Sequence, residues 1–234
     1  MKISNAGAPQ NALVIGASGG IGNAFVAALC DLMPGDAVNA LSRSGDGFDV
    51  TDEKSIIAAA EQFASDGQSF DLIFNAAGTL EPAGEGPEKS FDALSPEVMQ
   101  AAFATNTIGP ALVLKHFAPL LSKDQRSVFA TLSARVGSIG DNRLGGWMSY
   151  RSSKAALNQI VRCASIEFAR SHRQSVIVAL HPGTIETALT KKYAKGRYTD
   201  TSEGAARSMI SVLQYLTPKD TGKFFDYAGK EILW

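Results

Sequence analysis

The stretch ALVIGASGGIG (12–22) joins a short apolar run to a glycine-rich turn, and it decides the fold. The run 12–15 has the length and continuous hydrophobicity of a strand that is covered on both faces. After the glycines, Phe25, Ala28 and Leu29 recur at helical spacing, which indicates a helix with one apolar face. The stretch therefore predicts a strand, a tight turn and a helix in succession, the repeating unit of a parallel α/β sheet.

The same alternation continues along the chain. Further strands are expected at 37–41, 48–50, 71–74, 127–132, 175–180 and near 222–227. Helices are expected from 51 or 52 to about 65, over 95–121 with kinks or breaks at Pro110 and Pro119, over 147–171 and over 203–216. Residues 1–234 are therefore predicted to form one α/β domain, a doubly wound parallel sheet with helices on both faces. In such sheets, ligands bind at the carboxyl ends of the strands.

Composition narrows the classes of function. With 234 residues, 45% of them hydrophobic, the chain can bury the core of one large domain. A net charge of −1 with interspersed acids and bases disfavours nucleic acid and membrane surfaces as partners. No window reaches the roughly 18 consecutive apolar residues of a membrane span, and residues 1–10 hold no apolar signal segment. A cytoplasmic location is therefore expected.

Cysteine and histidine usage predicts neither a disulfide nor a metal site. Cys30 and Cys163 lie far apart in the sequence and are expected to be reduced and buried. The three histidines, His116, His172 and His181, show no metal-ligand spacing.

The glycine-rich turn predicts an anion-binding loop. Gly16, Gly20 and Gly22 form a G-x-x-x-G-x-G pattern between a strand and a helix. Glycine lets backbone amides approach an anion closely, and the helix start offers unpaired N–H groups to a pyrophosphate. The alternative is a turn that only packs against the helix. The position of the glycine-rich turn, between a strand and a helix, favours phosphate binding over this alternative.

A second stretch, SYRSSKAAL (149–157), places Tyr150 four residues before Lys154 within a predicted helix. Residues at this spacing lie on one helical face. The pair is either an ordinary surface contact, or an ammonium that holds a phenol ready to exchange a proton. The spacing alone leaves both interpretations open.

Three further motifs occur along the chain: NAAG (75–78), TNTIGP (105–110) and HPGTIET (181–187). With the glycine loop and the tyrosine–lysine pair, they make the chain resemble the short-chain dehydrogenase/reductase family over essentially its whole length. GSIGDN, GGW and the ending GKFFDYAGKEILW resemble its C-factor-like, or C-signal-like, branch. The resemblance implies a Rossmann-type fold and an NAD(P)(H)-dependent oxidoreductase acting on a carbonyl or secondary alcohol of a small molecule.

The resemblance also implies catalytic roles. Tyr150 would exchange a proton with the substrate oxygen, although a free phenol has a pKa of about 10. Lys154 would stabilise the phenolate and bind the nicotinamide ribose. Asn106 would hold a water in a relay from Lys154 to solvent. The segment 190–198 would form a lid over the substrate, and family members commonly assemble as homodimers or homotetramers.

The catalytic serine departs from the family pattern. The family has S-S-x-x-G, whereas this chain reads SARVG (133–137), so the matching position holds Ala134. A displacement of one residue in a strand reverses the direction of a side chain. Either a bulge or twist brings Ser133 into the site, or Ser138 replaces it, or the carbonyl is weakly polarised. We predict Ser133.

Cofactor preference is predicted from the end of the second strand, LSRSG (41–45). An acid there would bind the ribose of NAD, but the chain has Ser42 and Arg43 instead. A guanidinium can bind a 2′-phosphate through two hydrogen bonds, which favours NADP(H). Asp46 could reach the ribose instead, with NAD(H) as the alternative cofactor.

The cofactor-binding residues implied by these motifs are Gly16, Ser18, Gly20, Ile21, Gly22, Ser42, Arg43, Asp49, Val50, Asn75, Ala76, Ala77, Gly78, Lys154, Pro182, Gly183, Ile185 and Thr187.

A second class of function stays open, a dinucleotide-binding signalling or regulatory protein with little turnover. The displaced serine and the resemblance to the C-factor-like branch favour it. The tyrosine, lysine and asparagine favour catalysis.

Overall fold

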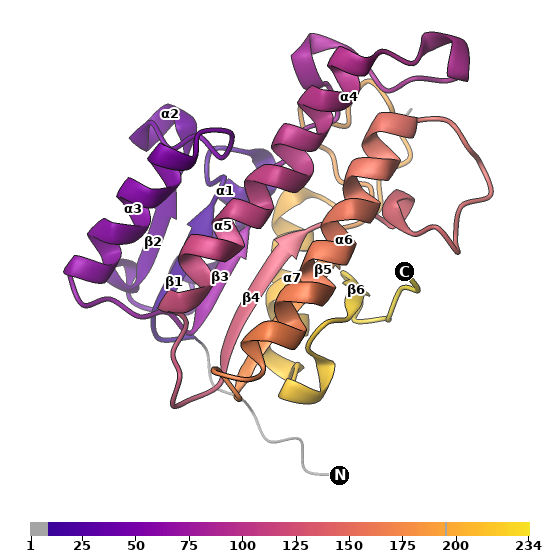
Figure 1. The fold of residues 1–234 in the computed structure, drawn as a ribbon. Helices are drawn as coiled ribbons and strands as arrows, with labels where there is room; N and C mark the ends of the chain where they lie inside the picture. Colours follow the sequence, from indigo (N-terminus) through magenta and orange to yellow (C-terminus); the bar gives the residue numbers. More distant parts are fainter. Residues whose placement is uncertain (1–8, 195) are drawn as a thin grey trace.

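A single parallel sheet forms the centre of the structure, a computed structural model that describes residues 9–194 and 196–234 (Figure 1). Its strands are β1 (Ala12–Ile15), β2 (Val38–Leu41), β3 (Leu72–Asn75), β4 (Ser127–Leu132), β5 (Ser175–His181) and β6 (Phe224–Asp226). They lie in the order β2-β1-β3-β4-β5-β6. This confirms the predicted fold class, because each strand pairs in parallel with its neighbours. The order reverses between β1 and β3, which is where such sheets bind ligands.

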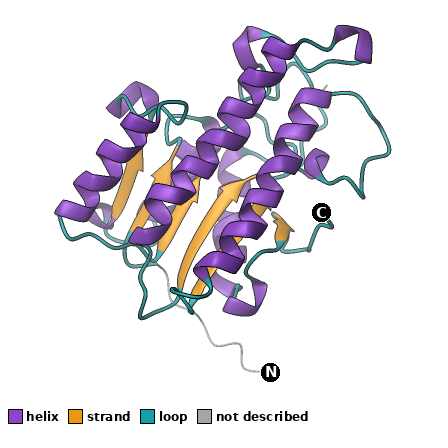
Figure 2. Ribbon diagram, viewed as in Figure 1, coloured by secondary structure: helices purple, strands orange, loops and turns teal. Residues whose placement is uncertain are grey.

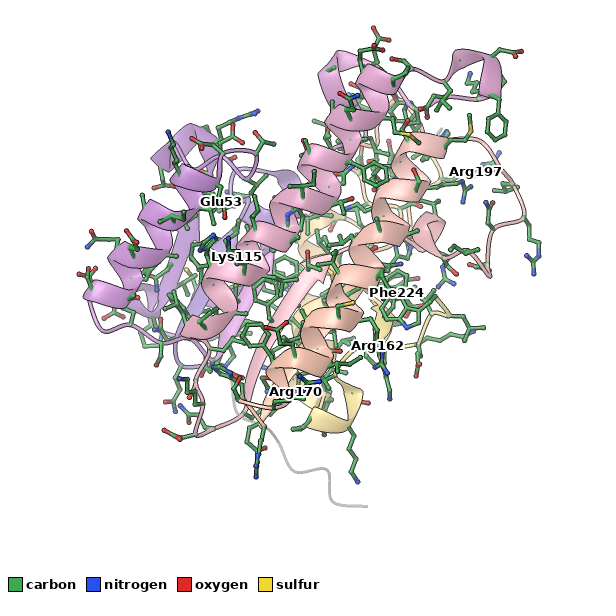
Figure 3. All side chains as sticks on the ribbon, in the orientation of Figure 1. Glu53, Lys115, Arg162, Arg170, Arg197 and Phe224 are labelled. Atoms are coloured by element: carbon green, nitrogen blue, oxygen red, sulfur yellow. The ribbon has the colours of Figure 1, made fainter. Side chains whose placement is uncertain are left out.

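Helices cover both faces of the sheet (Figure 2). α3 (Glu53–Ser65), α5 (Gly109–Phe117) and α6 (Met148–Phe168) lie on one face, and α1 (Gly20–Cys30) and α7 (Ser202–Tyr215) on the other. Each layer buries its own apolar cluster against the sheet. On the first face, Glu53 and Lys115 point toward each other from α3 and α5, with 2.8 Å between Oε1 and Nζ (Figure 3).

Successive side chains of β4 enter opposite layers. Val128, Ala130 and Leu132 pack into the cluster beneath α1 and α7. Phe129, one residue out of step, joins the cluster beneath α5 and α6. This alternation is expected of a strand, and it directs the next residue, Ser133, toward α6.

The expected strand at 48–50 is wrong. After β2 the chain enters a single helical turn, α2 (Arg43–Asp46), and reverses at Gly47 with a φ of 69°. Phe48 then turns inward against Phe117 of α5, with 6.0 Å between ring centroids. The hydrophobicity of residues 48–50 thus reflects an aromatic side chain buried beneath a helix layer. Because these residues add no strand, β2 is the edge of the sheet.

The expected long helix over 95–121 is divided by a change of helical form. α4 (Pro96–Phe103) passes into one π-helical turn (Ala104–Ile108), and α5 follows directly. Pro110 therefore lies just after the π-helical turn, where the regular α-helical hydrogen-bond pattern is already interrupted. Pro119 lies in the short 3₁₀ turn that ends the segment.

The predicted burial of the cysteines is also wrong. Cys30 on α1 and Cys163 on α6 are both exposed free thiols. Within the described residues, no helix combines the length and the hydrophobicity needed to cross a bilayer. The expectation for residues 1–10 concerns mostly residues 1–8, which lie outside the described part of the chain.

Candidate active site

Two adjoining cavities run along the carboxyl ends of the strands, where the strand order reverses. The outer cavity, of about 580 Å³, extends toward the end of β2, and the inner cavity, of about 420 Å³, extends toward the end of β5. They share Ser18, Gly19 and residues 76–79 as walls. Both volumes fall in the range of small-molecule and cofactor sites.

Most of the predicted site residues meet in these cavities. The outer cavity is lined by Gly16, Ser18, Ser42, Arg43, Asp49, Val50, Ala76, Ala77 and Gly78. The inner cavity is lined by Ser18, Gly20, Ile21, Gly22, Ala76, Ala77, Gly78, Ser133, Tyr150, Lys154, Pro182, Gly183, Ile185 and Thr187. Of the residues predicted, Asn75 and Asn106 line neither cavity.

The glycine loop is shaped for close backbone approach. Gly16 has a φ of +81°, and a Cβ there would lie 2.9 Å from the backbone nitrogen of Ala77. A Cβ on Gly22 would lie 2.2 Å from the Gly16 carbonyl oxygen, so only glycine fits. α1 begins beside the inner cavity without a side-chain cap and without an acidic residue in its first turn. The loop therefore fits a dinucleotide phosphate.

The end of β2 presents a cation to the outer cavity. The side chain of Arg43 is 82% exposed, and its Nη1 lies 4.0 Å from Asp49 Oδ2. Hydrogen bonds from the backbone and hydroxyl of Thr51 hold the pKa of Asp49 below its ordinary value. Asp46 lines neither cavity. Its carboxylate instead accepts the N–H of Ser42, at 2.9 Å, and closes the α2 turn.

The NAAG motif forms the wall between the cavities. Asn75 is fully buried, and its Oδ1 accepts the N–H of Ala77 at 3.1 Å, so it shapes the turn. Gly78 lies between two predicted catalytic groups. A Cβ there would be 3.2 Å from both Asn106 Oδ1 and Lys154 Nζ.

Tyr150 and Lys154 lie on the α6 face that borders the inner cavity. Lys154 Nζ donates to the Leu132 carbonyl, at 2.9 Å, at the end of β4. Burial lowers the pKa of Lys154 to about 8 and raises the pKa of Tyr150 above its ordinary value. Loss of hydration thus dominates the pKa values of both groups.

Asn106 lies within the π-helical turn and is fully buried. Its side chain binds the backbone of Thr79 twice, accepting the N–H at 2.8 Å and donating to the carbonyl at 2.9 Å. It also donates to Ser153 Oγ on α6, at 3.3 Å. Asn106 therefore connects the loop after β3 to the helix that carries Tyr150. Such π turns are frequent at functional sites.

Of the two candidate serines, Ser133 is the one in the cavity wall. No bulge is needed, because the alternation of β4 already directs its side chain toward α6. Its hydroxyl donates to Asn158 Oδ1 at 2.6 Å. Ser138 is buried outside both cavities and accepts the N–H of Asp141. Ala134 lines the inner cavity beside Ser133.

The HPG segment completes the inner cavity. Burial lowers the pKa of His181 to about 4, with the Arg135 guanidinium adding to the effect, so its imidazole is neutral at pH 7. Gly183 has a φ of +92°, which permits the reversal after β5. The side chain of Thr187 packs against the glycine loop, since a Cβ on Gly20 would lie 3.0 Å from Thr187 Cγ2.

The start of α6 depends on a remote residue that the sequence did not reveal. Gly145, Gly146 and Trp147 all have a positive φ, and Trp147 has no capping side chain. Glu88 supplies the cap, because its buried carboxylate accepts the N–H and the hydroxyl of Ser149. The loop 78–90 is therefore partly buried.

Other cavity residues were also missed. They include Thr79, Leu80, Glu81 and Pro82 after the NAAG motif, Thr105 before Asn106, and Ala188 and Leu189 after Thr187. Their one sequence signal is proximity to a motif. In the described residues, no group of histidine, cysteine or acidic side chains could hold a metal ion.

Comparison with known proteins gives concordant results. Residues 35–227 match the family described as enoyl-(acyl carrier protein) reductase. A 1-hydroxy-2-glutathionyl-2-methyl-3-butene dehydrogenase of Rhodococcus sp. (strain AD45) is 31% identical, covering 95% of this chain and 98% of the relative. The C-signal protein of Myxococcus xanthus is 35% identical over 136 residues, covering 58% of this chain and 78% of the relative. An NADPH-bound carbonyl reductase from chicken fatty liver superimposes with a TM-score of 0.84 at 28% identity, covering 98% of this chain and 96% of that one.

Proposed function

Because the chain belongs to the short-chain dehydrogenase/reductase family, we propose that it is an NADP(H)-dependent oxidoreductase acting on a carbonyl or secondary alcohol of a small molecule. One observation carries the proposal. Tyr150, Lys154 and Ser133 border the same cavity as the start of α1. A proton-transfer group and a phosphate-binding helix end thus share one space.

Different residues of the two cavities would bind different parts of the cofactor. A nicotinamide dinucleotide, when bound, supplies or accepts a hydride. The glycine loop and the start of α1 would hold its phosphates, and Lys154 would hold the nicotinamide ribose. Ile185 and Thr187, which line the inner cavity, would contact the nicotinamide end.

Proton handling is assigned to Tyr150. In reduction, its hydroxyl gives a proton to the substrate oxygen, and in oxidation it takes the proton back. Ser133 would polarise the carbonyl from the end of β4. Lys154 is held in place by the Leu132 carbonyl, and its positive charge would favour the phenolate. Asn106 would keep the loop after β3 in place against α6, because its side chain binds both.

The preference for NADP(H) rests on Arg43. Among the described residues that line the outer cavity, Arg43 is the sole cation, and its side chain is largely exposed. A guanidinium in that position can bind a 2′-phosphate. The NADPH in the chicken carbonyl reductase agrees with this preference.

The test combines cofactor titration with turnover. Binding of NADPH and NADH would be followed by fluorescence, and cofactor oxidation would be measured on a panel of aldehydes, ketones and diketones. We expect tighter binding of NADPH, and a loss of turnover of about 100-fold or more in Tyr150→Phe, with binding retained. Tyr215→Phe, a change at an exposed tyrosine, serves as the control. Failure to bind either cofactor would refute the proposal.

A second candidate is a dinucleotide-binding signalling protein with little turnover. The similarity to C-signal and the alanine at position 134 support it. Tight binding of a cofactor, with no turnover on the whole panel, would favour this candidate over the oxidoreductase.

A further inference from the structure

Two segments far apart in the sequence meet beside the cavities. Glu81, in the loop after β3, accepts the hydroxyl of Tyr193, with 2.6 Å between Oε1 and Oη. Lys192 Nζ lies 3.0 and 3.1 Å from the two carboxylate oxygens of Glu81. Glu81 lines the outer cavity, whereas residues 187–190 line the inner one. One carboxylate thus connects the loop after β3 to the segment that follows the HPG motif.

The loop after β3 is shaped around Tyr193. A Cβ on Gly86 would lie 2.6 Å from the Tyr193 hydroxyl, so the loop backbone lies directly against the end of this side chain. Glu85, the preceding residue, is exposed and forms none of the ion pairs found among the described residues. The contact is therefore specific to Glu81.

Tyr193 also reaches the start of the helix that carries Tyr150. The ring of Trp147 packs edge-on against Tyr193, at 5.6 Å between centroids, and against Tyr150, at 6.2 Å. The N–H of Trp147 donates to the carbonyl of Glu88, in the same loop as Glu81. The segment 187–194 is therefore held at the cavity by an aromatic contact on one side and a carboxylate on the other.

We propose that Glu81 is a positioning residue that, through Tyr193 and Lys192, fastens the segment 187–194 against the cavity containing Tyr150. Because residues 187–190 form part of the cavity wall, this fastening sets how often the wall opens. Under the proposed function, on which this part rests, the wall must move when a substrate enters or a product leaves. Glu81 then affects binding and release and leaves the proton transfer at Tyr150 unchanged.

Limited trypsin digestion tests the fastening without any activity assay. Cleavage after Lys191 and Lys192 would be timed in the native protein, in Glu81→Ala and in Tyr193→Phe, which leaves the Glu81–Lys192 ion pair intact. We expect cleavage to be about 5- to 10-fold faster in both variants, because cleavage tracks the population of the open form. Glu81→Gln, whose amide oxygen can still accept from Tyr193, should recover part of the protection. Glu85→Ala is the matched control and should cleave at the native rate.

Kinetics then separate positioning from catalysis. In Glu81→Ala and Tyr193→Phe, we expect KM for the carbonyl substrate to rise about 5-fold or more, with kcat changed less than about 2-fold. Native cleavage rates in both variants, or acceleration in Glu81→Ala alone, would overturn the proposal, as would a fall in kcat at unchanged KM. A native protein without turnover would instead refute the oxidoreductase function, and the trypsin result would still decide the role of Glu81.

Discussion

The Ser133 hydroxyl donates to Asn158 Oδ1 across 2.6 Å, which joins the end of β4 to the middle of α6. Lys154, one turn earlier on α6, binds the carbonyl of Leu132, the residue before Ser133. The helix thus holds two successive residues of the strand end. The hydrogen that Ser133 would offer to a substrate carbonyl is already engaged, and Ala134 beside it offers none.

Ser133→Ala is expected to lower kcat by about 10-fold. A preorganised donor to a developing oxyanion contributes roughly 100-fold or more, but Ser133 must first release Asn158. Steady-state kinetics on the best panel substrate would measure the loss. Ser138→Ala, outside both cavities, is the matched control and should keep the native kcat. A native kcat in Ser133→Ala would mean that Ser133 does not polarise the carbonyl.

Ala134→Ser is expected to increase activity. Position 134 borders the inner cavity with Ser133 and Tyr150, and a serine there would restore a hydroxyl where the family pattern has one. A new donor should raise kcat/KM by about 10-fold, a gain that a purely structural change would not produce. Unchanged or reduced kcat/KM, in a variant with native thermal stability, would contradict this.

Arg43→Ala is expected to weaken NADPH binding by about 10-fold or more and to leave NADH binding unchanged. The guanidinium can form charge-assisted hydrogen bonds to the 2′-phosphate, which NADH lacks. Fluorescence titration with each cofactor gives the two Kd values. Lys54→Ala removes an exposed cation that lines neither cavity and should change neither Kd. Equal weakening of both cofactors would count against a phosphate-binding role for Arg43.

Burial of Lys154 predicts how stability varies with pH. Its pKa falls from 10.5 to about 8 on folding, so between these values the unfolded chain binds a proton that the folded protein has lost. Stability should therefore rise with pH across this window, by up to about 1.4 kcal/mol per pH unit. Urea unfolding of the cofactor-free protein at pH 7.5, 8.5 and 9.5 would measure the rise. Lys154→Met should flatten it, whereas Lys89→Met, at an exposed site, should not. Equal slopes in native protein and Lys154→Met would refute the assignment.

Local patterns predicted the fold and most of the candidate site. The strand, glycine turn and helix of 12–22 form as expected, because backbone conformation and amide exposure there depend on neighbouring residues. The strand expected at 48–50 was wrong because the hydrophobicity of Phe48 does not indicate whether its side chain belongs to a sheet or packs beneath a helix. Glu81 and Glu88 carry no motif, and their partners lie 112 and 61 residues away. Only the folded chain brings these pairs together.

The cap that Glu88 places on Ser149 has a consequence for the diversification of this protein. Because α6 is fastened at its start by a residue of another loop, the stretch 139–144 that precedes it is not the sole anchor of Tyr150. This stretch includes Ile139 and Leu144, which are 78% and 91% exposed. We therefore expect this stretch to tolerate exchange, in natural divergence or in loop grafting, while Tyr150 keeps its position.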